Sequence, residues 1–141
     1  MDTLKFLAAE CAVRRLIGHY AHLVDGRQLD ECERLFADDA VLEVMGEIYR
    51  GRAEVRRWLD TLNNWGPPGK HMVCNHVVRW PDGGALTAIS DFMVFKDKGG
   101  TWASNSRGAY HDQFVYRGQD LLFQHRRIEV VFAKGAPTKP A

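Results

Sequence analysis

The sequence predicts a single α+β domain in which N-terminal helices pack on a strongly curved antiparallel β-sheet, so that the domain forms a cone. Three observations predict this class. Helical periodicity occurs in the first half of the chain, and β-rich runs with short glycine-containing breaks fill the second half. The 141 residues suit one domain with one core. Helices over the open side of a bent sheet leave a mouth, which is a natural small-molecule pocket.

The helices are predicted from apolar residues that recur every three or four positions. Residues 3–25 form one amphipathic pattern. Asp30 followed by Glu33 resembles a capping box, which predicts a short second helix that runs through Phe36. A third helix ends before the WGPPG segment at residues 65–69, because that segment suits neither a helix nor a central strand. The apolar face of this third helix carries Val55, Trp58, Leu59 and Leu62.

The strands are predicted from β-rich runs and from the turns between them. A strand at residues 40–45 turns at Gly46 into a short partner at residues 47–50. Short glycine-containing breaks separate four longer runs and predict hairpins, so the second half is an antiparallel meander. These runs are residues 71–80, 85–96, 102–116 and 121–133. The domain is expected to span residues 1–134, with a flexible tail at residues 135–141.

The composition excludes several classes of function. The 19 Lys and Arg residues balance 18 Asp and Glu residues to a net charge of +1, so no overall field attracts nucleic acid or an anionic membrane. Cys11, Cys32 and Cys74 form no CxxC pair, and the six histidines show no ligand spacing with a carboxylate. We therefore expect no metal and no cofactor. Without a signal peptide or membrane span, the protein is expected to be soluble and cytoplasmic.

Five local strings, in this order, resemble a known superfamily. They are YAHLVD at residues 20–25, LFADDA at 35–40, YRGR at 49–52, HMVCN at 71–75 and GAYHDQF at 108–114. The chain resembles the nuclear transport factor 2-like (cystatin-like) α+β cone over residues 5–133, and within it the SnoaL-like families. Those families include scytalone dehydratase, polyketide cyclases, bile acid dehydratases and the hexachlorocyclohexane dehydrochlorinase. The same fold also hosts hydrolases, isomerases, oxygenase subunits and binding modules.

The resemblance implies roles for four residues. In the dehydratase and dehydrochlorinase branch, an aspartate that closes the first helix pairs with a histidine that opens the strand after the third helix. These positions are Asp25 and His71 here. A basic residue on the last strand falls at Arg126, with Arg127 as its neighbouring alternative. Tyr20, one helical turn before Asp25, matches a polar position that lines the cavity.

The residue types suit proton abstraction. A histidine base works best when a carboxylate holds its second ring nitrogen, so Asp25 would orient His71. Tyr20 or Tyr110 would donate a proton to a leaving hydroxyl, and Arg126 would stabilise developing negative charge. Structural roles stay open: Asp25 can complete a helix end, His71 can be an exposed strand-end histidine, and Arg126 can lie at the surface or an interface.

Further residues are candidates for shaping the pocket. Asn75 shares strand parity with His71, which places both on one face; alternatively, Asn75 binds the backbone at a bulge. Asp91 interrupts an apolar strand, so it is either a second pocket acid or the ion-pair partner of an arginine on the next strand. The other candidate substrate-binding residues are Val44, Trp58, Phe92, Tyr110 and Phe114.

These observations lead to one favoured function and two alternatives. The favoured function is elimination of water or halide, or a related isomerisation, on a small apolar molecule such as a polyketide, steroid, terpenoid or aromatic compound. The first alternative is a ligand-binding or accessory-subunit cone without chemistry. The second is epoxide hydrolysis, for which Asp91 with Arg107 would imitate an Asp–Arg–Asp site. In each case we expect a homo-oligomer, dimer or trimer, because the convex sheet face needs cover.

Overall fold

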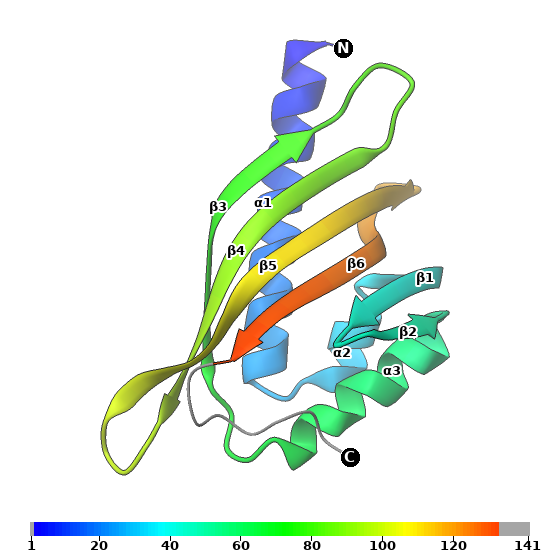
Figure 1. Ribbon diagram of the computed structural model, residues 1–141. Coiled ribbons are helices and arrows are strands. Elements are labelled where there is room, and N and C mark those ends of the chain that lie inside the picture. The colour runs from blue at the N-terminus through cyan, green and yellow to red at the C-terminus, as the bar shows by residue number, and fades with distance from the viewer. Residues whose placement is uncertain (1, 133–141) are drawn as a thin grey trace.

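The computed structural model describes residues 2–132 and places three α-helices against a six-stranded sheet (Figure 1). This confirms the predicted α+β class; the expected tail at residues 135–141 lies outside the described residues. In chain order the elements are α1 (Thr3–Asp25), α2 (Leu29–Glu33), β1 (Phe36–Val44), β2 (Glu47–Arg50), α3 (Arg52–Thr61), a 3-10 helix (Leu62–Asn64), β3 (Lys70–Arg79), β4 (Leu86–Asp97), β5 (Trp102–Arg117) and β6 (Asp120–Phe132).

The long helix α1 has the predicted bounds and fixes where the site begins. The Asp2 side chain caps its first turn by accepting a hydrogen bond from the Leu4 backbone N–H at 3.0 Å. Its apolar stripe is buried against the sheet, as the helical spacing predicts. Gly26 caps the end of the helix, and its N–H donates a hydrogen bond to the His22 carbonyl at 2.9 Å. Its last residue, Asp25, therefore lies at the edge of the core. Within residues 2–132, no helix combines the length and hydropathy that a bilayer span requires.

The second helix differs from its prediction at both ends. Gln28, rather than Asp30, occupies the N-cap position, and its side chain makes no capping bond. Because the Gln28 N–H already bonds the Leu23 carbonyl at 2.9 Å, the chain enters the helix earlier, and Asp30 instead pairs with Arg56 of α3. The helix stops at Glu33 because Phe36 begins strand β1. The capping-box prediction was therefore wrong.

The sheet has the strand order β2-β1-β6-β5-β4-β3. Strands β3 to β6 form the predicted antiparallel meander, and β1 with β2 forms the predicted hairpin. Strand β1 joins the meander by pairing in parallel with β6, from Phe36 opposite Phe123 to Val44 opposite Ile128. This long-range pairing starts β1 earlier than residue 40, the predicted start. The chain thereby places β1 beside the last strand of the sheet.

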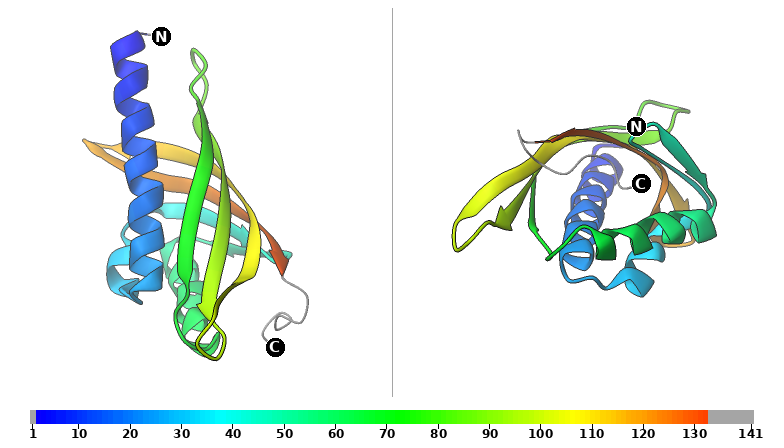
Figure 2. Two further views of the ribbon diagram at one scale, coloured as in Figure 1. Left: turned by 90° about the vertical axis from the view of Figure 1, so that its left-hand side faces the viewer. Right: turned by 60° about the horizontal axis from the view of Figure 1, so that its bottom comes forward.

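The sheet bends around α1 and forms the cone. Register shifts interrupt the β3–β4, β4–β5 and β5–β6 pairings, and such bulges increase bend and twist. Figure 2 shows the sheet arching over α1, with α3 beside the open end. Along β4, Phe92 and Val94 are buried on the inner face, whereas Ile89 and Met93 are about two-fifths exposed on the outer face. One face of the sheet therefore builds the core and the pocket.

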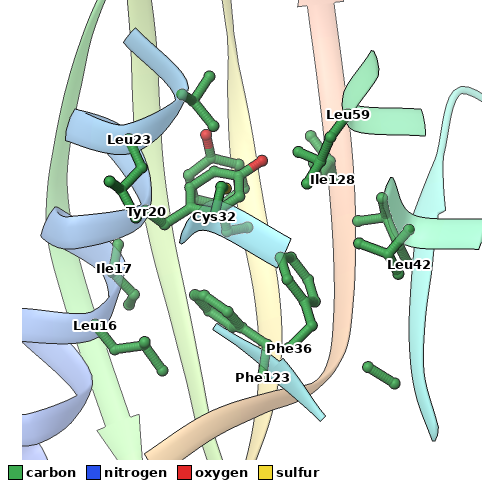
Figure 3. Close-up of a cluster of buried hydrophobic side chains, with 14 of the residues drawn as sticks. Leu16, Ile17, Tyr20, Leu23, Cys32, Phe36, Leu42, Leu59, Phe123 and Ile128 are labelled. Carbon is green, nitrogen blue, oxygen red and sulfur yellow. The ribbon is translucent and has the colours of Figure 1, made fainter. Parts of the chain in front are cut away.

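Aromatic side chains fill the centre of this core. Tyr20 reaches from α1 across the inner face of the sheet, close to Phe36 and Phe123 (Figure 3). The Tyr20 ring meets those of Phe36 and Phe123 edge-on, at centroid distances of 6.1 and 5.8 Å. Edge-to-face contacts of this kind stabilise the core beyond simple area burial. Tyr20 is thereby held between the core and the pocket.

Candidate active site

A pocket lies between the inner sheet face, the C-terminal end of α1 and α3. The empty space between its lining atoms, counted out to the open mouth, is about 680 Å³. The walls are mainly aromatic and aliphatic and include Tyr20, Val44, Trp58, Phe92, Tyr110 and Ile128. The polar groups that line it include Arg27, His71, Lys96, Asn105 and Ser106.

The structure brings Asp25 and His71 into direct contact. Asp25 ends α1 and His71 is the second residue of β3, and Figure 1 shows β3 running alongside α1. The Nδ1 atom of His71 is 2.5 Å from Oδ1 of Asp25. Both side chains are largely buried, with exposed fractions of 15% for His71 and 11% for Asp25. A contact this short between partly buried groups is a charge-assisted hydrogen bond when the imidazole is protonated.

The same carboxylate also holds the backbone of His71. Its Oδ2 atom accepts a hydrogen bond from the His71 N–H at 2.9 Å, and Lys70 Nζ lies 3.8 Å from Oδ2. The two-point contact fixes both the position and the rotation of the imidazole. Nε2 of His71 makes no hydrogen bond to any residue between 2 and 132, and the side chain lines the pocket. Nε2 is therefore the nitrogen left for a bound molecule.

Two tyrosines form the inner wall of the pocket. The Tyr20 and Tyr110 rings meet edge-on with centroids 6.1 Å apart, and Phe92 stacks on Tyr110 at 4.5 Å. Burial raises the pKa of Tyr20 well above its ordinary value, and burial likewise raises the pKa of Tyr110. Both phenols therefore remain protonated around neutral pH, as hydrogen-bond donors must.

Arg126 lies behind these tyrosines rather than in the pocket. Its guanidinium forms a bidentate ion pair with Asp112, with both N–O distances 2.7 Å, and both side chains are fully buried. The guanidinium carbon is 4.0 to 4.3 Å from the ring centroids of Tyr20, Tyr110 and Phe123. Burial by itself would lower the pKa of Arg126, but Asp112 outweighs this effect and raises it. The predicted direct contact with substrate is corrected: Arg126 supports the tyrosines that line the pocket.

Other predicted site residues divide between the pocket and the rest of the molecule. Val44, Trp58, Phe92 and Tyr110 line the pocket. Phe114 is buried outside it, where its ring packs against Phe123 at 5.5 Å.

The polar candidates on β3 and β4 lie outside the pocket. Asn75 and Asp91 are exposed and bind each other, with Asn75 Nδ2 donating to Asp91 Oδ2 at 2.8 Å. The proposed pairing of Asp91 with a neighbouring arginine is absent among residues 2–132, because Asp91 faces outward with Asn75 as its partner. Arg107 is also exposed and lies opposite Met93 on the outer face. The Asp–Arg arrangement for epoxide hydrolysis is therefore not formed in the pocket.

Four polar lining residues were missed by the sequence reasoning. Lys96 shares strand parity with Phe92, a signal that could have placed it on the inner face. Asn105 and Ser106 follow each other, so alternation predicts opposite faces, yet both are 7% exposed and line the pocket. The reason is the bulge in the β4–β5 pairing, which no local sequence pattern predicts. Arg27 lies just beyond α1, where the sequence shows only a loop.

The geometry defines a class: a curved α+β cone whose pocket presents a histidine held by a carboxylate. The chain belongs to the SnoaL-like domain family, whose model matches residues 5–127. Its fold is also that of a solved protein described as nuclear transport factor 2-like, in agreement with the resemblance of the sequence. No curated protein matches the chain significantly.

Solved structures share this fold at low sequence identity. One is a candidate scytalone dehydratase from Novosphingobium aromaticivorans, with TM-score 0.80, 16% identity and coverage of 93% of this chain and 89% of that chain. A second, from the same organism, is a nuclear transport factor 2-like protein with a cystatin-like fold, with TM-score 0.80, 23% identity and coverage of 94% and 87%. A third is the beta subunit of a candidate aromatic-ring-hydroxylating dioxygenase from that organism, with TM-score 0.77, 18% identity and coverage of 96% and 94%. These likenesses establish the fold.

Proposed function

We propose that the protein is a cofactor-independent acid–base enzyme that eliminates water or halide from a small, largely apolar molecule, or isomerises it by the same proton abstraction. The observation that carries this proposal is the contact between Asp25 and His71 at the pocket wall. The SnoaL-like family and the likeness to a candidate scytalone dehydratase support an enzymatic role. Polyketide, steroid, terpenoid and aromatic compounds have the apolar character that the lining suits.

His71 acts as the base. Its Nε2 lone pair takes a proton from a carbon next to a carbonyl group, and the C–H electron pair forms a double bond as the neighbouring C–O or C–halogen bond breaks. Asp25 accepts the hydrogen bond of Nδ1–H, which fixes the tautomer that leaves Nε2 unprotonated, and stabilises the imidazolium that forms. The backbone contact to Asp25 keeps the ring in place throughout.

The leaving group departs with its electron pair. A halide leaves as the anion, whereas a hydroxide needs a proton, which Tyr20 or Tyr110 supplies because burial keeps both phenols protonated. The imidazolium then releases its proton to solvent and the phenolate takes one back, which restores the starting state. In the isomerisation no group leaves, and His71 returns the proton to a different carbon.

Proton exchange in D₂O tests this function with simple ketones in place of the natural substrate. Cyclic ketones with a hydroxyl or halogen two carbons from the carbonyl are incubated with the protein, and proton NMR follows both deuterium incorporation and alkene formation. His71→Ala is expected to lower the rate by a factor of about 10²–10⁴, the usual contribution of a general base. The matched control is His111→Gln, because His111 lies outside the pocket and pairs with Glu129. A His71→Ala variant as active as the wild type would overturn the proposal.

A binding or accessory-subunit role is the second candidate. The likeness to the beta subunit of a candidate dioxygenase favours it, as does the exposed apolar outer face of the sheet, where Met72 is 53% exposed. In that role the pocket binds ligand without turnover. The wild-type protein would support this candidate over the enzyme if it binds the test ketones but neither exchanges their protons nor eliminates their hydroxyl or halogen.

A further inference from the structure

One end of the pocket carries four polar side chains that the proton abstraction does not use. Arg27 reaches in from the segment after α1, Lys96 from the end of β4, and Asn105 with Ser106 from the β5 bulge. Asn105 and Ser106 are each only 7% exposed. Neither side chain forms a hydrogen bond with any residue between 2 and 132. Both side chains line the pocket and their polar atoms are not sealed from it, so a ligand or water there can supply the missing hydrogen bonds.

The two cations, Arg27 and Lys96, also have no ion-pair partner among residues 2–132. Lys96 Nζ donates to the Trp65 carbonyl at 2.6 Å, and Arg27 Nη1 donates to the Val24 carbonyl at 3.0 Å. Neither forms an ion pair with a residue between 2 and 132, and within that range no Asp or Glu lines the pocket. Burial lowers the pKa of Arg27 more than the charge of Asp25 raises it. Burial and then the charge of Arg27 lower the pKa of Lys96, so the two cations lie close enough to repel each other. A bound anion would relieve this repulsion.

The strand register places this cationic end relative to His71. His71 lies opposite Val94 across the β3–β4 pairing, and Lys96 is two residues farther along β4 on the same face. Two residues of strand span about 6–7 Å. This distance is close to the width of a six-membered ring. A ring that fills the apolar part of the pocket can therefore reach His71 with one side and Lys96 with the other.

We propose that the molecule bound in this pocket is an anion, a mainly apolar ring compound whose carboxylate lies between Arg27 and Lys96 and accepts hydrogen bonds from Asn105 and Ser106. The proposal rests on the proposed function only in placing the reacting carbon near His71. Carboxylate binding itself requires the four polar residues and no chemistry. Charge-assisted hydrogen bonds from arginine and lysine are among the strong contacts that recognise a carboxylate.

Equilibrium binding of a matched pair of probes tests the proposal. Hydrocinnamate and hydrocinnamamide share one apolar body and differ in charge, and titration calorimetry measures both, with the fluorescence of the lining residues Trp58 and Trp65 as a second signal. Hydrocinnamate is expected to bind about tenfold tighter or more, the value of one charge-assisted hydrogen bond. The preference is expected to weaken as salt is added. Equal binding of the two probes, or no binding of either at millimolar concentration, would overturn the proposal.

Variants of the lining residues test which side chains cause the preference for hydrocinnamate over hydrocinnamamide. Lys96→Met and Arg27→Gln are each expected to reduce it and the double variant to abolish it, whereas Lys96→Arg retains it. Asn105→Asp, which is close in shape, is expected to remove the preference, because its carboxylate repels the bound carboxylate. Lys98→Met is the matched control, since Lys98 is exposed and lies outside the lining. A preference that survives the double variant contradicts the proposal.

His71→Ala separates this inference from the proposed function. The variant is expected to keep the preference for hydrocinnamate while it loses proton exchange. Loss of exchange together with equal binding of the two probes refutes the anion site alone. A retained preference in a wild-type protein that exchanges no protons refutes the enzyme alone.

Discussion

The contacts of Arg126 explain how a charged side chain can be buried in an aromatic core. The Arg126 guanidinium is compensated by the bidentate Asp112 carboxylate and by the faces of three aromatic rings. A charge with neither compensation would cost several kcal/mol to bury. Because two of those rings belong to Tyr20 and Tyr110, the ion pair also fixes the inner wall of the pocket. Arg126 is therefore a positioning residue.

Removal of the carboxylate is expected to destabilise the protein strongly. Asp112→Ala leaves the buried guanidinium unpaired, which lowers the free energy of unfolding by about 3–5 kcal/mol. The double variant Asp112→Leu with Arg126→Met removes both charges and is expected to lose less than Asp112→Ala alone, because no charge stays buried without its partner. Urea unfolding followed by circular dichroism measures all the variants. An Asp112→Ala protein within about 1 kcal/mol of the wild type contradicts the compensated-charge interpretation.

Single residues also show which part of the site the sequence can predict. The approach of Asp25 to His71 follows from where α1 ends and β3 begins, and both positions were marked by local strings. The burial of Arg126 was not predictable, because it depends on the cross-strand partner Asp112 and on Tyr20 from another element. The cationic end was missed because Arg27 and Lys96 meet only in three dimensions.

At the scale of the elements, a glycine sets how closely two strands approach. A Cβ added at Gly108 of β5 would lie 1.7 Å from the Glu129 carbonyl oxygen of β6 and 3.0 Å from the Phe92 ring. Gly108 lies opposite Phe92 in the β4–β5 pairing, so this bare backbone lets the pocket residue Phe92 pack flat over β5. Any side chain here must push the strands apart.

Gly108→Ala is therefore expected to be destabilising, in contrast to a second glycine that has space. The clash is with backbone, which cannot move aside cheaply, so a loss of about 1–3 kcal/mol is expected, as for other overpacked sites. Gly18→Ala in α1 is the control, because nothing lies within 4 Å of the added Cβ. Alanine there is expected to stabilise the helix by about 0.5–1 kcal/mol. Equal thermal midpoints for the two variants would contradict this account.

The strands also show where local sequence patterns no longer predict the structure. In β4 burial alternates over residues 86–94, and it places the candidate Phe92 in the pocket and the neighbouring candidate Asp91 outside it. In β3 the same rule failed: Asn75 has a positive φ of 53° at a register shift between Cys74 and Val77, so it does not share the pocket with His71. Likewise, the start of β1 depends on pairing with β6, which lies far along the chain. Bulges and long-range pairing are set by the whole sheet.

The whole molecule buries one face of its sheet and leaves the other uncovered. The outer face carries an apolar strip of side chains that are 40–53% exposed: Met72, Val77, Ile89 and Met93. Single exposed apolar residues are ordinary, but a contiguous group across β3 and β4 indicates an interface. The surrounding charges have both signs, with Asp91 and Glu129 near Arg107 and Arg127. We propose that a second copy of the chain covers this face, because a mixed-charge surface around an apolar strip can be self-complementary under a twofold axis.

The expected outcome is a homo-oligomer that separates when the strip is charged. Light scattering coupled to size-exclusion chromatography measures the mass in solution, and the wild type is expected to exceed the 16.0 kDa of one chain. Replacing Ile89 and Met93 together by lysine places charges at the centre of the strip, where burial of unpaired charge opposes association, and is expected to give the monomer. Ile48→Lys is the matched control, since Ile48 is 49% exposed on β2 at the far edge of the sheet. A monomeric wild type, or a doubly substituted variant that keeps the wild-type mass, would show that the outer face is not the interface. Because the pocket opens on the opposite face of the sheet, the monomeric variant is expected to keep its ligand binding, which separates assembly from the site.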